Sequence, residues 1–196
     1  LDERMINYSK VHAKVKPFCI YFPQFHTLAE NNKNYYSGMT DVTNLQKYLA
    51  ENENVHNLMT PSKDILNLTG PFNYDLSYSA IIQRQVEIAK SFGIYGFAVY
   101  YYWFSVNSIT NKNLIMDTCF DRFFNGDIIL GDNFKIYFIW ANEDWSNNAA
   151  FNTKEQIYNI YDIENFKSNI KTLIKYFRNV NYYKIDNKPV FYVHHP

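Results

Sequence analysis

Apolar residues occur in two kinds of pattern along this chain. Short continuous apolar runs predict buried strands at 18–22, 96–101, 136–140 and 190–193, with a shorter one near 58–60. Apolar positions three and four residues apart predict helices over 41–54, 79–92, 113–124 and 162–177. Continuous apolar strands that alternate with helices are typical of a parallel sheet covered by helices. The sequence therefore predicts an α/β fold.

Local signals predict where the helices begin and end. Ser79 is expected to cap the helix over 79–92, and Gly93 is expected to end it. Asp162 and Glu164 are spaced like a metal-binding Asp-x-Asp motif, but acids at a helix start complement the helix dipole. We therefore interpret both as helix-start residues.

Length and charge narrow the class of protein. The chain has 196 residues, enough for one domain, which we place at 17–196 after a polar lead-in at 1–16. Its 19 Lys and Arg residues balance 19 Asp and Glu residues, so no basic excess indicates a nucleic-acid partner. Because no apolar run is long enough to span a membrane and no apolar signal segment follows Leu1, we expect a cytoplasmic protein.

Aromatic residues make up 19% of the chain, and this excess has two explanations. An AT-rich genome raises Tyr, Phe, Asn, Ile and Lys together, and this explanation is favoured for the chain as a whole. Aromatic faces also bind sugar rings, so their positions are more informative than their number. The two cysteines, Cys19 and Cys119, are expected to be small buried hydrophobic residues.

Polar and aromatic residues follow the predicted strands, at the ends where parallel α/β folds bind ligands. Amphipathic side chains that form hydrogen bonds suit a sugar site. The residues predicted to bind substrate are Gln24, His26, Tyr101, Tyr102, Trp103, Trp140, Asn142 and Trp145.

The strongest chemical signal is a pair of acids between two tryptophans. A carboxylate beside indole rings can act as a general acid, which makes Glu143 the first catalytic candidate. Glycoside cleavage typically uses two carboxylates, and Asp144 and Asp41 are the candidates for the second. The alternative is that Asn142 and Asp144 cap the following segment while Glu143 is an exposed loop acid.

The histidines give weaker signals. His26 could orient a substrate or pair with an acid, but an ordinary loop histidine fits equally well. His194 and His195 are adjacent, and neighbouring residues of a strand point to opposite faces, so we expect no shared metal ion. The sequence has no Gly-rich phosphate loop and no nucleophile elbow. We therefore predict no metal and no cofactor.

Four motifs in order resemble the WbsX-like glycosyltransferases, which are related to the endo-mannosidase-like glycoside hydrolase family 99. They are YFPQFH at 21–26, GFAVYYYWF at 96–104, WANEDW at 140–145 and DNKPVF at 186–191. The resemblance implies a TIM-type (β/α)₈ barrel, polysaccharide biosynthesis and Glu143 as an active-site acid. A complete barrel needs about 250 residues. We therefore expect the N-terminal part of a barrel, incomplete in this chain.

Two functions remain open at this point. One is a carbohydrate-active enzyme, a glycosyltransferase or a glycosidase, that acts on a glycan or sugar donor through an active-site carboxylate. The other is a non-catalytic glycan-binding remnant, or one segment of a split or larger enzyme. Tyr101 and Val42 favour the second, since the family has His and Trp there. We expect activity only with a second polypeptide or a C-terminal segment that completes the barrel.

Overall fold

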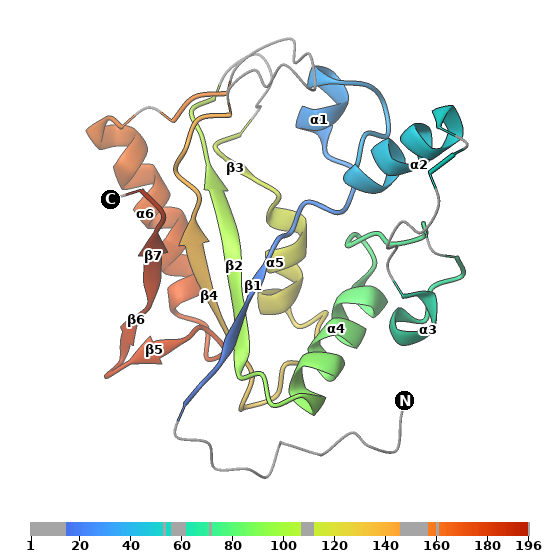
Figure 1. The fold of residues 1–196 in the computed structure, drawn as a ribbon. Coiled ribbons are helices and arrows are strands. Elements are labelled where there is room, and N and C mark those ends of the chain that lie inside the picture. Colours follow the sequence, from blue (N-terminus) through green and yellow to red (C-terminus); the bar gives the residue numbers. More distant parts are fainter. Residues whose placement is uncertain are drawn as a thin grey trace.

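A parallel sheet forms the centre of the molecule (Figure 1). The computed structural model describes residues 15–52, 54–55, 62–70, 72–106, 112–145, 157–159 and 161–195. The strands are β1 (Phe18–Tyr21), β2 (Gly96–Trp103), β4 (Lys135–Trp140) and β7 (Phe191–Val193), and they lie in the order β1-β2-β4-β7. All three pairings between them are parallel, which confirms the predicted α/β class. The strand predicted near 58–60 lies outside the described residues.

At Gly96, the first residue of β2, the backbones of β2 and β4 approach each other closely. Gly96 lies opposite both Phe18 and Lys135 in the register. A Cβ atom at Gly96 would lie 1.9 Å from the carbonyl oxygen of Lys135. Only a residue without a side chain therefore allows this approach of the two backbones.

Three helices cover one face of the sheet: α4 (Ser79–Ser91), α5 (Asp117–Asn125) and α6 (Ile163–Phe177). Alternate residues of the strands point to these helices, so the main core contains every second side chain of β2 and β4. On the opposite face, Ile20 is 66% exposed and Tyr192 is 54% exposed. In the described part of the chain the helices therefore cover the sheet mainly from one side.

The connection from β1 to α4 carries three shorter helices, α1 (Ala29–Asn34), α2 (Asp41–Glu51) and α3 (Lys63–Leu66). Thr40 caps α2, because its side chain accepts a hydrogen bond from the backbone of Thr43 while Thr43 Oγ1 accepts one in return. The predicted helix over 41–54 is thus confirmed at its start, and it ends three residues early, at Glu51.

Two details of the predicted helices are wrong, although the helix over 79–92 begins where it was predicted. Ser79 is the first residue of α4, not its cap, and its hydroxyl accepts a hydrogen bond from Arg122 of α5. In the segment predicted as helix over 113–124, Leu114 and Ile115 instead form β3, which is antiparallel to the end of β2. The apolar pair is buried against β2, so tertiary pairing decides its conformation over the helical pattern.

The end of the chain contains a hairpin that the apolar pattern did not indicate. Strands β5 (Lys184–Ile185) and β6 (Lys188–Pro189) are antiparallel. The two residues between them, Asp186 and Asn187, both have positive φ angles, of 49° and 61°. Asp and Asn tolerate this conformation, and a two-residue loop of this kind suits the twist of a hairpin.

The cysteines differ in burial. Cys119 is buried in the main core, as predicted, whereas Cys19 is exposed. The prediction for Cys19 is wrong, and its strand β1 is an edge strand of the described sheet, paired with β2 alone. Both thiols are free.

Helix α6 buries only part of its apolar surface. Leu173 is fully buried, whereas Ile163, Phe166, Ile170 and Ile174 are between 36% and 71% exposed. The apolar positions of this helix therefore extend beyond its contact with the sheet.

The helices of the described part contain no segment that is long and apolar enough to cross a membrane.

Candidate functional site

The candidate site is built on two loops that follow neighbouring parallel strands. Trp140 ends β4 and is followed by Asn142 and Glu143, while His194 and His195 follow the end of β7. Because β4 and β7 are parallel neighbours, both loops leave the sheet at the same edge.

The Asn142 side chain joins the two loops. Its Nδ2 donates a hydrogen bond of 2.6 Å to the carbonyl oxygen of His195, and its Oδ1 accepts one of 2.8 Å from the His195 backbone. The His194 backbone donates to the carbonyl oxygen of Trp140 at 3.0 Å. Both polar atoms of the Asn142 amide therefore serve to fix the loops relative to each other.

These bonds place the Glu143 carboxylate beside His194. The distance from Glu143 Oε2 to His194 Nδ1 is 3.6 Å, and both side chains are nearly half exposed. Burial raises the pKa of Tyr102 well above its usual value, and the charge of Glu143 raises it further. The Tyr102 hydroxyl thus keeps its proton.

The two C-terminal histidines lie together, which corrects the expectation from the strand pattern. Their ring centres are 4.4 Å apart. One ligand atom each of Glu143, His194 and His195 lie within 4.8 Å of one another. Alternation between faces does not apply to His194 and His195, because β7 ends at Val193.

Asp144 is tied to the chain that returns from the β4 loop. Its Oδ1 accepts a hydrogen bond of 2.7 Å from the backbone N–H of Asn159. The Asn159 amide in turn donates to the carbonyl oxygen of Glu143 at 2.9 Å. Asp144 and the Glu143 backbone therefore hold the chain at Asn159 against the β4 loop.

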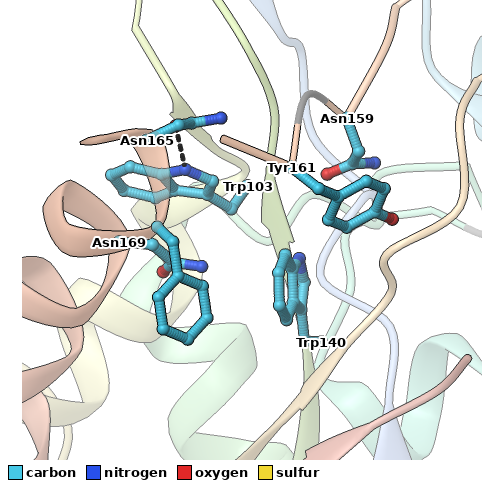
Figure 2. A pocket seen from close by; sticks show the side chains of 7 residues that line it. Trp103, Trp140, Asn159, Tyr161, Asn165 and Asn169 are labelled. Carbon is cyan, nitrogen blue, oxygen red and sulfur yellow. Dashed lines mark hydrogen bonds between the residues drawn. The ribbon is translucent and has the colours of Figure 1, made fainter. Parts of the chain in front are cut away.

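A small pocket lies beside this loop, between the end of the sheet and the start of α6 (Figure 2). Trp103 and Trp140 are buried in it, with 4% and 8% of their surfaces exposed, whereas Tyr161 and Phe166 are mostly exposed. The lining is completed by the amide side chains of Asn159, Asn165 and Asn169.

Two contacts connect the pocket with the acidic loop. Asn159 lines the pocket and contacts Glu143 and Asp144 as described above. Tyr161 also lines it, and its hydroxyl donates to the carbonyl oxygen of Asn142. A ligand in the pocket would therefore lie close to the loop that carries Glu143.

The indole N–H of Trp140 is a buried donor without an acceptor among the described residues. Figure 2 shows this nitrogen at the end of the ring that is nearest to Trp103 and Tyr161. An unpaired buried donor costs free energy, and the ring that carries this one lines the pocket.

Tyr101 and Trp103 hold helix α6 against the sheet. The Tyr101 hydroxyl donates to Asn169 Oδ1 at 2.7 Å, and the Trp103 indole donates to Asn165 Oδ1 at 2.8 Å. Tyr101 is fully buried, so its ring has no surface for a substrate. Tyr102, one residue away, lies on the other side of the sheet and packs against Phe104.

Replacement of Tyr101 by Phe is expected to lower the free energy of unfolding by about 1–3 kcal/mol, because the Asn169 side chain loses its buried partner. Chemical unfolding followed by circular dichroism measures this difference. The exposed Tyr78 provides the control, and its change to Phe should have little effect. Equal stability of the Tyr101 variant and the wild type would contradict the structural role.

Three further residues that the sequence predicted to bind substrate have contacts of their own. Trp145 packs edge-on against the ring of Tyr102. Gln24 and His26 follow β1, and His26 is buried next to Cys119 of α5, with 3.8 Å between Nδ1 and Sγ. Burial lowers the pKa of His26, although the charge of Asp75 acts in the opposite direction.

Asp41 is separate from the β4 loop. It is the first residue of α2, which Figure 1 shows beyond β1, on the side of the sheet away from β4. Partial burial raises the pKa of the Asp41 carboxyl group. The structure thus brings Glu143 and Asp144 together and leaves Asp41 on another element.

Sequence reasoning missed Tyr161 and Phe166 as lining residues. Phe166 is one of the regularly spaced apolar positions that predict the helix over 162–177, and Tyr161 lies just before that helix in a polar segment. One available signal was that both aromatic residues lie close to the start of a helix that follows the acidic motif.

Comparison with known proteins places these residues in a wider context. The sequence model of a family described as Glycosyltransferase WbsX matches residues 17–196. The chain is also similar to the uncharacterized protein WxcX from two strains of Xanthomonas campestris pv. campestris. The identity is 23% over 177 residues, which covers 90% of this chain and 23% of each relative. The chain thus spans about a quarter of the length of these curated relatives.

Proposed function

The chain belongs to the WbsX glycosyltransferase family, and on this basis we propose that it transfers a sugar from a donor to a hydroxyl group of a glycan. The observation that carries the proposal is the position of Glu143, an exposed carboxylate on a loop fixed by Asn142 next to a pocket of aromatic and amide side chains. Sugar rings bind to such surfaces through stacking and hydrogen bonds.

In the proposed reaction, Glu143 is the general base. The carboxylate accepts the proton of the acceptor hydroxyl while that oxygen forms a bond to the anomeric carbon of the donor. The bond from the anomeric carbon to the leaving group breaks in the same step, and the leaving group takes the bonding electron pair. This chemistry needs one carboxylate within reach of the acceptor.

The positions of the other acids favour transfer over hydrolysis with two carboxylates. The two carboxyl groups of a glycosidase lie about 5–9.5 Å apart on either side of the scissile bond. Asp144 already accepts the Asn159 backbone N–H, and Asp41 lies on α2 beyond β1. Glycosidase action with Glu143 as the acid remains the second candidate, supported by the Trp140 and Trp145 rings on either side of the motif.

The sugar is proposed to lie against the exposed rings of the pocket. Changing Tyr161 or Phe166 to Ala is expected to weaken glycan binding by about tenfold, since loss of an aromatic stacking contact costs roughly 1–1.5 kcal/mol. Calorimetry or a glycan array measures this loss. Ile163→Ala is the matched control on α6, because Ile163 is exposed but does not line the pocket. Equal losses in all three variants would argue against a sugar site here.

We also propose that further polypeptide completes the sheet into a TIM-type barrel. In the described part of the chain, β7 is an edge strand paired only with β4. Ile20 and Tyr192 are exposed on the face of the sheet opposite the helices. Ile163 and Ile170 are exposed on α6. Unpaired edges and apolar surfaces favour association with another segment or chain. Full activity is accordingly proposed for the completed assembly.

A screen of sugar donors and glycan acceptors tests the proposed function. Transfer of label from donor to acceptor that depends on Glu143 supports it. Release of free sugar from a glycan without a donor would favour the glycosidase alternative. Glycan binding without turnover, both alone and with added downstream polypeptide, would show a binding module instead.

A further inference from the structure

We propose that Glu143, His194 and His195 form a binding site for one divalent transition-metal ion such as Zn²⁺. We call these three residues the Glu–His–His cluster. It combines one carboxylate and two imidazoles from two loops that leave the same edge of the sheet.

The spacing of the cluster fits a shared ion. Zinc binds imidazole nitrogen and carboxylate oxygen at about 2.1 Å, so two ligand atoms of a tetrahedral ion lie about 3.4 Å apart. Glu143 Oε2 and His194 Nδ1 are 3.6 Å apart. The ligand atoms of all three residues lie within 4.8 Å of one another, so small side-chain rotations bring His195 to the same distance.

The backbone of the cluster is held in place before any ion binds. The Asn142 amide makes two hydrogen bonds to the His195 backbone, and the His194 backbone bonds to Trp140. The three ligand side chains are themselves exposed and can turn toward an ion without displacing the core. The fixed backbone reduces the entropy lost on metal binding, because only the side chains become ordered when the ion binds.

The ligand types select the class of metal. Imidazole favours zinc, nickel, cobalt and copper, whereas magnesium and calcium prefer oxygen ligands. Two imidazoles and one carboxylate occupy three positions, which leaves at least one for water or another ligand. We therefore expect Zn²⁺, Co²⁺ or Ni²⁺ to bind and Mg²⁺ to bind much more weakly.

The ion would regulate the active site. Coordination uses the carboxylate lone pair of Glu143 that the general base needs to accept a proton, so the bound ion is expected to inhibit transfer. This consequence rests on the proposed function, whereas the binding of the metal does not.

Titration of the metal-free chain with ZnCl₂ by calorimetry, and with CoCl₂ by absorption spectroscopy, tests the cluster directly. The wild type is expected to bind one Zn²⁺ at this site and to show the visible bands of a low-coordinate Co²⁺ ion. His194→Asn, His195→Asn and Glu143→Gln should each weaken binding by at least about tenfold. His12, His26 and His56 are unchanged in every variant, so any Zn²⁺ binding that remains in all three variants comes from sites outside the cluster.

The control is Glu164→Gln, which removes an exposed carboxylate on α6 outside the cluster. Its affinity for Zn²⁺ should equal that of the wild type. Unchanged affinity in the two histidine variants, or equal binding of Mg²⁺ and Zn²⁺, would overturn the metal site.

The two proposals fail separately. Cluster-dependent Zn²⁺ binding in a chain without sugar transfer supports the metal site and contradicts the proposed function. Sugar transfer in a chain without cluster-dependent Zn²⁺ binding supports the proposed function and contradicts the metal site. If both are present, Zn²⁺ should lower the rate of the wild type more strongly than that of His194→Asn, each relative to its own metal-free rate. Equal inhibition of the two would overturn the regulatory part.

Discussion

Glu143→Gln is expected to reduce sugar transfer by about 10²–10⁴-fold, the usual contribution of a general base. The amide has nearly the shape of the carboxylate, but it does not accept the proton of the acceptor hydroxyl. Since Glu143 is exposed and its backbone oxygen keeps the bond to Asn159, folding should not change. The rate is measured as labelled sugar transferred to the acceptor, in the preparation that shows turnover.

Two controls separate this loss from other causes. Glu164→Gln removes an exposed carboxylate on α6 that lies outside the loop and should leave the rate within about twofold of the wild type. Binding of the acceptor glycan to Glu143→Gln should remain, because the pocket rings are intact. A variant with the wild-type rate would remove Glu143 from the mechanism, and a loss equal to that of Glu164→Gln would do the same.

Gly96→Ala is expected to lower the free energy of unfolding by about 3 kcal/mol or more, at the upper end of the range for overpacking. The new Cβ atom would meet the carbonyl oxygen of Lys135 at 1.9 Å and the Phe18 ring at 2.7 Å. The oxygen belongs to the backbone of the neighbouring strand and cannot turn away like a side chain. β2 and β4 would have to separate at their first pair.

Gly70→Ala is the matched control, because a Cβ atom there meets only the Asn73 amide, at an ordinary 3.7 Å. Its stability should differ from that of the wild type by less than about 1 kcal/mol. Urea unfolding followed by circular dichroism compares the variants. Failure of Gly96→Ala to fold while Gly70→Ala folds would also support the clash. If Gly96→Ala folds, its hydrogen exchange in β2 and β4 is compared with that of the wild type. Wild-type protection in β2 and β4 would contradict the predicted close approach.

The sequence by itself determined the four parallel strands, the four longest helices and their order. The runs at β2 and β4 are apolar at nearly every position, which is typical of strands in a parallel sheet, and both strands were predicted within two residues. Asp162 caps α6 through the backbone of Asn165, as predicted from the acids at the helix start. These features depend on residues close together in the chain, so a local pattern is enough to identify them.

The family and the acidic motif were also visible in the sequence, because short motifs keep their order along the chain. Their position after the strands correctly placed Glu143 and Trp140 at the carboxyl edge of the sheet. The pattern did not assign a role to each side chain. That assignment depends on which partner another part of the chain supplies.

Only the tertiary structure decided those partners. Tyr101 and Trp103 turn to the helical layer, where Asn169 and Asn165 accept their hydrogen bonds across more than sixty residues of sequence. No local period encodes such a contact, because it depends on how α6 packs against the sheet.

Tertiary packing also brings the Glu143 side chain close to those of His194 and His195. The strand rule predicted opposite faces for His194 and His195, but the strand ends at Val193 and the Asn142 amide then sets the path of the backbone. The parallel pairing of β4 with β7 brings together loops about fifty residues apart in sequence. Sequence therefore determined which chemical groups are present at the edge of the sheet, and packing determined which of them meet.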